Sequence, residues 1–385
     1  MRTGSQVTAN ELPDGVAERV SVPEPLAPEL APNGPATATT PVLNGSGLAG
    51  VVGSGRPVRV VPYEPGLAEL WDSFVGASRN GTLFHERRFL GYHPEGRFVD
   101  DSVLVYRDER LLAVYPAALD ASDGETWTVS HPGSTYGGAV VAADATLADV
   151  ADTLSAIVDR ARSDGRDGVR IRLSEQAFRR LPTDEIEFVL WTLGFQQAAV
   201  ELSTTIGLRA GVDAARRRYR GDTARSVRSA ARNGVAVEWS DDFAAFWSVL
   251  EENLQRHGAR PTHSLDEIER LRSLCGPDRI RLAVGRVGGA LAAGVVVFVA
   301  TPQVFHSFYI AQDYAYQQTR ALGAVVDHLI GWGAAEGFDW FNLGISTESR
   351  GRVINWGLFR FKEGFGGTGF ARTTYALRLG ESGVG

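Results

Sequence analysis

The sequence predicts a mixed α/β (α+β) protein of two tandem units, each with a mixed, mostly antiparallel sheet flanked by helices. Three observations support this prediction. Short apolar stretches with the two-residue period of strands alternate with longer stretches whose apolar residues recur at helical spacing. The order of these stretches occurs twice, in residues 57–210 and again in residues 211–385. Ahead of them, residues 1–56 are rich in Pro, Ala and Gly without sustained periodicity, so we expect a disordered tail there.

The composition excludes several classes of protein. The chain has 385 residues, a net charge of -7 and a single cysteine, Cys275, which leaves no intramolecular disulfide to form. No Cys/His cluster or acidic triad predicts a metal site. The negative charge argues against a DNA-binding protein, although it is compatible with a local basic patch. Neither a membrane-spanning run of about 18 apolar residues nor a signal-peptide segment is visible, so we expect a cytoplasmic protein.

The first unit alternates strands and helices after an antiparallel hairpin. The expected strands are 102–106 and 111–118, joined by a turn at 107–110, followed by 127–130, 169–173 and 202–208. The expected helices are 147–163, with Val150, Leu154, Ile157 and Val158 on one face, and a helix through Ile186, Val189 and Leu190.

The second unit repeats this order with stronger signals. Gly288-Gly289 predicts a tight hairpin, and Ser264 followed by Glu267 predicts a helix start with a capping box. The expected strands are 280–287, 290–300, 303–311, 338–343 and 371–379, and the expected helices are 243–256, one beginning at 264, and 320–336.

Lys362 is the single lysine among 39 cationic residues. An ammonium group is a compact, strongly hydrated charge with a tunable pKa, which a guanidinium is not. A lysine kept among arginines therefore favours a specific task, such as holding a phosphate, stabilising an oxyanion or acting as a covalent amine. The alternative is a surface lysine without a special role.

The second unit resembles the Gcn5-related N-acetyltransferase (GNAT) superfamily in its order of hairpin, third strand, helix and short strand. The tandem copy, the segment Arg225–Val235 and the closing Phe361-Lys362-Glu363-Gly364-Phe365-Gly366 resemble the Fem-like branch. The resemblance covers residues 211–379, and the first unit shares it through topology and His131-Pro132-Gly133…Tyr136-Gly137-Gly138. It implies an N-acyltransferase that joins an activated acyl or aminoacyl donor to an amine acceptor, with Lys362 near the reacting carbonyl.

The resemblance also implies a donor that acts as a co-substrate, with no tightly bound cofactor. Acyl-CoA users of the fold hold the pyrophosphate with Gln/Arg-x-x-Gly-x-Gly/Ala at a helix N-terminus. Arg320 and Gly323 fit the first half of this pattern, but Val325 stands where Gly or Ala is expected. This departure favours aminoacyl-tRNA or a carrier-protein thioester as the donor. An acyl-CoA-dependent N-acetyltransferase and a catalytically silent binding module remain the alternatives, and the acceptor is a small-molecule or peptide amine.

A cluster of arginines opens the second unit. Seven arginines fall between residues 216 and 232, and Arg225 and Arg228 would share one helix face. We expect these two to contact donor phosphates, with a solvated face paired to acids as the alternative.

Two polar segments supply the remaining candidates. In the linker 256–264, His257 is a candidate base and Arg256 and His263 are candidate substrate contacts, although His257 also suits a helix C-terminus. The segment 344–352 follows a short strand, where ligands gather in α/β sheets. In it, Glu348 is a candidate base, with an ion pair to Arg350 or Arg352 as the alternative.

Further candidates complete the expected site. Strand alternation places Tyr309, a catalytic candidate, on the opposite face from His306, which we interpret as a core histidine. The expected substrate contacts besides Arg256 and His263 are Thr347, Arg350, Asn355 and Tyr136.

Overall fold

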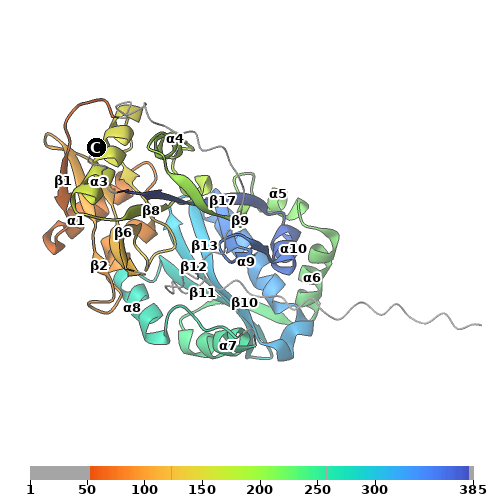
Figure 1. Ribbon diagram of the computed structural model, residues 1–385. Coiled ribbons are helices and arrows are strands. Elements are labelled where there is room, and N and C mark those ends of the chain that lie inside the picture. Colours follow the sequence, from red (N-terminus) through yellow and green to blue (C-terminus); the bar gives the residue numbers. More distant parts are fainter. Residues whose placement is uncertain (1–52, 123, 257, 381–385) are drawn as a thin grey trace, which may run out of the picture.

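The computed structural model describes residues 53–122, 124–256 and 258–380, and it confirms a mixed α/β protein of two similar units (Figure 1). The predicted tail falls mostly on residues 1–52, which lie outside the described residues. Ser54, at the described start, donates to Asp152 from its backbone N–H and from its hydroxyl, both at 2.6 Å. The first unit therefore makes contacts with residues ahead of position 57.

The first unit contains short helices, a long central helix and two groups of strands. Its helices are α1 (Ala68–Ala77), α2 (Arg87–Leu90), α3 (Leu147–Ser163) and α4 (Glu185–Thr192). Its strands are β1 (Arg59–Pro62), β2 (Val99–Asp100), β3 (Val103–Arg107), β4 (Arg110–Tyr115), β5 (Ala117–Ser122), β6 (Glu125–Ser130), β7 (Val140–Val141), β8 (Gly168–Arg172) and β9 (Gln196–Gly207).

The second unit repeats the order of strand, two helices, hairpin, strand, helix and strand. Its helices are α5 (Val212–Arg217), α6 (Gly221–Arg232), α7 (Phe243–Gln255), α8 (Leu265–Cys275), α9 (Ala321–Ala335) and α10 (Trp356–Gly364). Its strands are β10 (Val235–Ser240), β11 (Ile280–Val287), β12 (Ala290–Thr301), β13 (Val304–Gln312), β14 (Trp340–Ile345), β15 (Thr347–Glu348), β16 (Val353–Ile354) and β17 (Thr368–Arg378).

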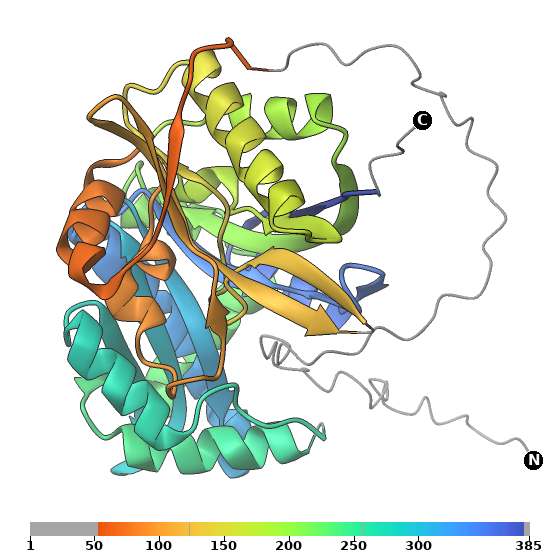
Figure 2. The ribbon, with the colours of Figure 1, turned by 60° about the vertical axis from the view of Figure 1, so that its left-hand side comes forward.

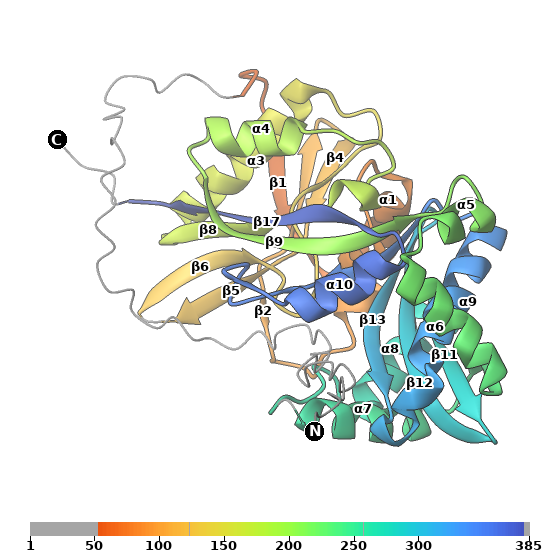
Figure 3. The ribbon, with the colours of Figure 1, turned by 90° about the vertical axis from the view of Figure 1, so that its right-hand side faces the viewer.

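An eleven-stranded sheet runs through both units in the order β10-β11-β12-β13-β14-β9-β17-β8-β6-β5-β2. The pairs β13–β14 and β6–β8 are parallel, and the other described pairs are antiparallel. The last strand of each unit pairs with the short strand of the other unit, because β14 pairs with β9 and β8 pairs with β17. Figure 3 shows β9 and β17 side by side at the centre of the molecule. The units are therefore joined by an exchange of strands.

The predicted strand 111–118 is wrong in one respect, since it is two strands. Pro116 separates β4, in a four-stranded sheet with β1, β3 and β7, from β5 in the large sheet. Proline has no N–H to donate to a strand partner, so the chain changes sheets at this residue. The Pro116 carbonyl instead accepts from the backbone N–H of His131 at 3.4 Å.

The hydrophobic core that joins the units is mainly aromatic. Phe84 and Phe89 of the first unit pack against Phe298 of the second, with ring centroids 6.1 and 6.2 Å apart. Figure 2 shows α7 below the strands of the second unit, where it packs on one face of β12 and β13, and α8 lies beside α7 and contacts α2. No helix in the described ranges is long and apolar enough to cross a membrane.

Candidate active site

Lys362 lies on α10, a helix that the sequence patterns did not predict. The helix starts at Asn355, whose Oδ1 accepts from the backbone N–H of Leu358 at 3.0 Å. The Lys362 side chain is fully buried, and its Nζ donates to the carbonyls of Gly344 and Ile345 at 3.0 and 2.7 Å. Burial lowers the pKa of the Lys362 ammonium well below its ordinary value. The interpretation of Lys362 as a surface residue is therefore wrong.

The two carbonyls that hold Lys362 lie at the end of β14, beyond the point where β14 stops pairing with β13. The parallel pairing covers Val304↔Trp340 to His306↔Asn342. On its other side β14 pairs with β9 from Trp340 to Ile345, and this pairing continues past the end of the pairing with β13. Ligands of α/β sheets bind where parallel strands end or diverge. Lys362 is therefore a candidate for the reaction centre.

A buried hydrogen-bond network lies beside this point. The Asn342 Oδ1 accepts from the backbone N–H of Gly344 at 2.9 Å and contacts the His306 Nδ1 at 2.7 Å. The Asn342 Nδ2 donates to the hydroxyls of Ser203 and Thr205 at 3.2 and 2.8 Å. Because Asn342 accepts through Oδ1, His306 carries its proton on Nδ1. Burial lowers the pKa of His306 to about 4, so the ring is neutral at pH 7.

The network continues across the central strands towards the first unit. Arg372 on β17 donates from Nε and Nη2 to one oxygen of Glu201 on β9, at 3.0 and 2.7 Å. Tyr136, a predicted substrate contact, donates its hydroxyl to Glu175 at 3.2 Å. Burial raises the pKa of Glu175, and the positive charge of Arg372 opposes this shift. Residues from both units therefore form one buried polar cluster around the strand exchange.

The segment after β14 brings four predicted residues together. Asn355 Nδ2 donates to the Glu348 carboxylate at 3.2 Å, so these two candidates are in contact. Thr347 precedes Glu348 on β15, and its Oγ1 is buried without a hydrogen-bond partner among the described residues. Arg350 is exposed at the tip of the β15–β16 hairpin.

Tyr309 and His263 form a separate pair, and the predicted face of Tyr309 is wrong. A β-bulge lies between Val296↔Tyr309 and Val297↔Ser307, so Phe308 is an extra residue and the alternation shifts. Tyr309 consequently packs in the same aromatic core as Phe308. Its hydroxyl contacts the His263 Nδ1 at 2.7 Å, and burial lowers the pKa of His263 to about 3. His306 is a buried, hydrogen-bonded core histidine, as expected.

The linker 256–264 contributes less to the candidate site. Arg256 is bound to Glu252 one turn earlier on its own helix at 2.9 Å, and its guanidinium lies 4.6 Å from the ring centroid of Tyr314. His257 lies outside the described residues. Nothing in the described structure brings Arg256 into the Lys362 cluster.

The predicted donor residues lie on α6 and at the start of α9, which are neighbours in Figure 3. Arg225 and Arg228 are exposed, and no carboxylate among the described residues pairs with either. Arg320 adopts a left-handed φ of 65° directly before α9, whose first residues Ala321 and Leu322 are buried. A Cβ atom added to Gly323 would lie 3.7 Å from the Ser226 hydroxyl on α6. The first turn of α9 is thus covered by α6.

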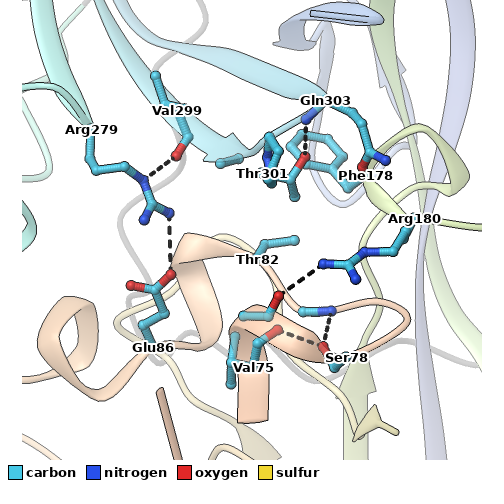
Figure 4. Close-up of a pocket in the computed structure, with 14 residues that line it drawn as sticks. Val75, Ser78, Thr82, Glu86, Phe178, Arg180, Arg279, Val299, Thr301 and Gln303 are labelled. Carbon is cyan, nitrogen blue, oxygen red and sulfur yellow. Dashed lines mark hydrogen bonds and ion pairs between the residues drawn. The ribbon is translucent and has the colours of Figure 1, made fainter. Parts of the chain in front are cut away.

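A pocket of about 240 Å³ lies elsewhere, at the opposite end of β13 (Figure 4). Its lining comes from α1 and the loop after it, from Phe178 and Arg180, and from the turn Thr301–Gln303 between β12 and β13. An ion pair of 3.2 Å between Arg279 and Glu86 closes one side. It contains none of the predicted site residues, so we place the candidate site at the Lys362 cluster.

Residues 215–363 match the family model of an acetyltransferase (GNAT) domain. The match identifies a GNAT domain within the second unit, and the solved structures compared next share the fold. A search of curated proteins by sequence finds no match.

Solved structures show the same fold at low sequence identity. The crystal structure of FemX has a TM-score of 0.64 at 12% identity and covers 83% of this chain and 97% of its own. The structure of L-PGS from Bacillus licheniformis has a TM-score of 0.52 at 14% identity, with 83% and 93% covered. A tandem GNAT protein from the clavulanic acid biosynthesis pathway has a TM-score of 0.50 at 12% identity, with 85% and 100% covered.

The sequence patterns missed most of the buried polar cluster. Its residues Asn342, Glu201, Arg372 and Glu175 come from four separate segments. Asn342 and Ser203 are 139 residues apart in the chain, and Arg372 and Glu201 are 171 apart. A signal existed only for Asn342, a buried amide within an otherwise apolar short strand.

Proposed function

We propose that this protein is an N-acyltransferase that forms an amide bond between an activated acyl or aminoacyl donor and an amine acceptor. Aminoacyl-tRNA or a carrier-protein thioester is the favoured donor. The observation that supports this proposal most strongly is Lys362, the single lysine, buried at the end of β14 with two backbone carbonyls as partners. In its ammonium form Lys362 has three N–H groups, and two of them are used in this way, which leaves one for a substrate oxygen.

The proposed reaction begins with attack by a neutral amine on the donor carbonyl. The C–N bond forms, the carbonyl oxygen becomes an oxyanion, and the ester C–O or thioester C–S bond then breaks. Lys362 would stabilise the oxyanion, since a fixed donor in a dry site needs no reorganisation during the reaction. The amine proton would pass to Glu348 or to the leaving oxygen or sulfur. Thr347 and Tyr136 would contact the acceptor.

The donor side of the proposal rests on α6. Unpaired exposed arginines at Arg225 and Arg228 suit a polyanion, as does Arg320 at the neighbouring start of α9. The covered first turn of α9 and Val325 favour a donor other than CoA, because a pyrophosphate needs free backbone N–H groups there. The acyl-CoA-dependent N-acetyltransferase remains the second candidate because the second unit matches a GNAT domain.

The arginine face predicts a salt-dependent affinity for tRNA. If the face contacts Z phosphates, the logarithm of the affinity should fall with the logarithm of salt concentration at a slope of about -0.7Z to -0.9Z. Arg225→Ala with Arg228→Ala should make this slope shallower by about one to two. Arg209→Ala is the matched control, because Arg209 is exposed but paired with Asp339 at 2.8 Å. An unchanged slope in the double variant would show that α6 has only a solvated face.

A donor screen tests the proposed activity. The full chain is incubated with a library of amines and one donor at a time, and amide products are detected by mass spectrometry. The donors are aminoacyl-tRNA, a loaded carrier protein and acetyl-CoA. We expect products with one of the first two. Products with acetyl-CoA alone would favour the second candidate, and the absence of amide with every donor would support a silent binding module.

A further inference from the structure

Arg172, at the end of β8, is a cation without an acidic partner among the described residues. Its side chain is half-buried, its Nε is buried without a hydrogen-bond partner, and no described carboxylate forms an ion pair with its guanidinium. The buried arginines among the described residues, Arg107, Arg179 and Arg372, all have acidic partners. Arg107 pairs with Asp149 and Asp152, and Arg179 pairs with Glu187. A guanidinium without an acid in a partly dry site is costly, so a ligand is the natural partner.

The surroundings of Arg172 add positive charge. Arg172 lies opposite Thr374 on β17, two residues from Arg372. Burial is the largest influence on Arg172 and the Arg372 charge is the second, and together they lower the pKa of Arg172 to about 10. Two acids influence this pair. Glu201 makes both of its close contacts to Arg372, and Glu175, whose pKa burial raises, accepts from Tyr136. The local charge is therefore unbalanced towards positive.

A strained hairpin brings another cation within electrostatic range of Arg172. Ser349 and Arg350 have left-handed φ values of 50° and 57°, a conformation that non-glycine residues rarely adopt. Gly351 follows at φ 87°, where a Cβ atom would lie 1.7 Å from the Val200 carbonyl oxygen. The tip is thus pressed onto β9 next to Glu201. Arg350 is exposed without an acidic partner among the described residues, and its charge acts on Arg172.

The arginines are close to the proposed reaction centre. The charges of Arg372 and Lys362 both lower the pKa of His306, so both groups lie within electrostatic range of its ring. A Cβ atom on Gly344, whose carbonyl holds Lys362, would lie 3.4 Å from the His306 ring. A molecule bound at Arg172 and Arg350 would therefore lie beside the buried polar cluster of Arg372 and Glu201.

We propose that Arg172 and Arg350 bind an anionic group, a carboxylate or a phosphate, of the amine acceptor. The identification of the ligand as the amine acceptor rests on the proposed function, but the anion site itself does not. Two guanidinium groups offer paired N–H donors that match the oxygens of either anion. The acceptor class would then be an amine that carries a negative charge at a distance from its nucleophilic nitrogen.

A binding experiment without turnover tests the site. Inorganic phosphate and acetate are titrated calorimetrically into the wild-type chain, Arg172→Gln, Arg350→Gln and the control Arg378→Gln, whose exposed arginine pairs with Glu125 at 2.7 Å. The background is the variant with Arg225 and Arg228 replaced by Ala, which removes anion binding on α6. We expect Arg172→Gln and Arg350→Gln each to weaken the preferred anion at least tenfold, with the control unchanged. The preferred probe distinguishes a phosphate from a carboxylate.

The melting temperature of the ligand-free protein separates a binding arginine from a structural one. Because Arg172 lies beside Arg372 without an acid, Arg172→Gln should leave the melting temperature unchanged or raise it. A clear drop, or equal anion affinity in wild type and both variants, would overturn the inference. The protein could also bind the anion through Arg172 and yet form no amide with any donor. That result would support this site and contradict the proposed function.

Discussion

Lys362→Ala is expected to lower kcat by about 10²- to 10³-fold, the usual loss for one donor to a reacting oxygen. It should also destabilise the fold, because the buried carbonyls of Gly344 and Ile345 would lose their partner, at about 1–3 kcal/mol for each unsatisfied group. Lys362→Met keeps most of the stem volume and should lose as much turnover with less destabilisation. Lys362→Arg should recover part of the turnover, since a planar guanidinium does not fit the place of an ammonium.

A control is needed because stability and turnover fall together in these variants. Val158→Ala in α3 removes buried methyl groups from the core of the first unit, away from the Lys362 cluster. It should lower the unfolding free energy by about 1–2 kcal/mol and leave kcat near wild type when assayed below the melting transition. Near-normal turnover in Lys362→Met would assign Lys362 a purely structural task, the fastening of α10 to β14.

The protein is expected to lose most of its stability between about pH 6.5 and 4. Burial lowers the pKa of His85 and His306 to about 4 and that of His131 and His263 to about 3, from 6.5. Below pH 6.5 the unfolded chain binds protons that the folded chain excludes, so stability falls as the pH falls and levels off near the folded pKa values. At pH 5 each such histidine lowers the free energy of unfolding by about 2 kcal/mol. The four together approach the typical total stability of a protein, about 5–15 kcal/mol.

Chemical denaturation at pH 7.5, 6.5, 5.5 and 5.0 measures this loss. Burial raises the pKa of Glu86 and Glu175, and these groups act in the opposite direction, so the summed loss is an upper value. Replacing His306 by Gln removes one group that binds a proton only in the unfolded chain. The loss of unfolding free energy between pH 7.5 and 5.0 should then be smaller by about 2 kcal/mol. A stability that stays constant over this range would contradict the account of neutral, buried histidines.

The sequence predicted those helices and hairpins whose ends are determined by neighbouring residues. Helix α3 was predicted from 147 to 163 and has these bounds, because Thr146 and Asp149 form a reciprocal cap ahead of a continuous apolar face. The hairpin between β11 and β12 was predicted from Gly288-Gly289, and both glycines have positive φ values of 58° and 86°. Such signals lie within a few residues of one another, so a single sequence contains them.

The exchange of β9 and β17 could not be predicted in this way. A strand pattern shows which face of a strand is apolar but does not identify its neighbour in the sheet. The bulge at Phe308 left no local signal either, and it reversed the predicted face of Tyr309. The polar cluster depends on this exchange, because Glu201 on β9 meets Arg372 on β17 only where the two units pair.

Candidate site residues were found where one segment carried several polar groups. Thr347, Glu348 and Arg350 lie on the hairpin after β14, and Glu348 meets Asn355 there. Arg172 was missed because an arginine at a strand end is ordinary in a chain with so many arginines. Arg172 is unusual because no carboxylate among the described residues pairs with it. Only the assembled structure shows which charges are paired.

A donor competition tests the central claim of amide-forming acyl transfer most directly. Aminoacyl-tRNA, a loaded carrier protein and acetyl-CoA, each with a different isotope label in the acyl group, are supplied together with one charged amine acceptor, and the label in the amide product is read by mass spectrometry. We predict an amide that carries the tRNA or carrier label with wild type and about 10²- to 10³-fold less of it with Lys362→Met. No labelled amide from the wild-type chain, or the same amount from Lys362→Met, would contradict the account.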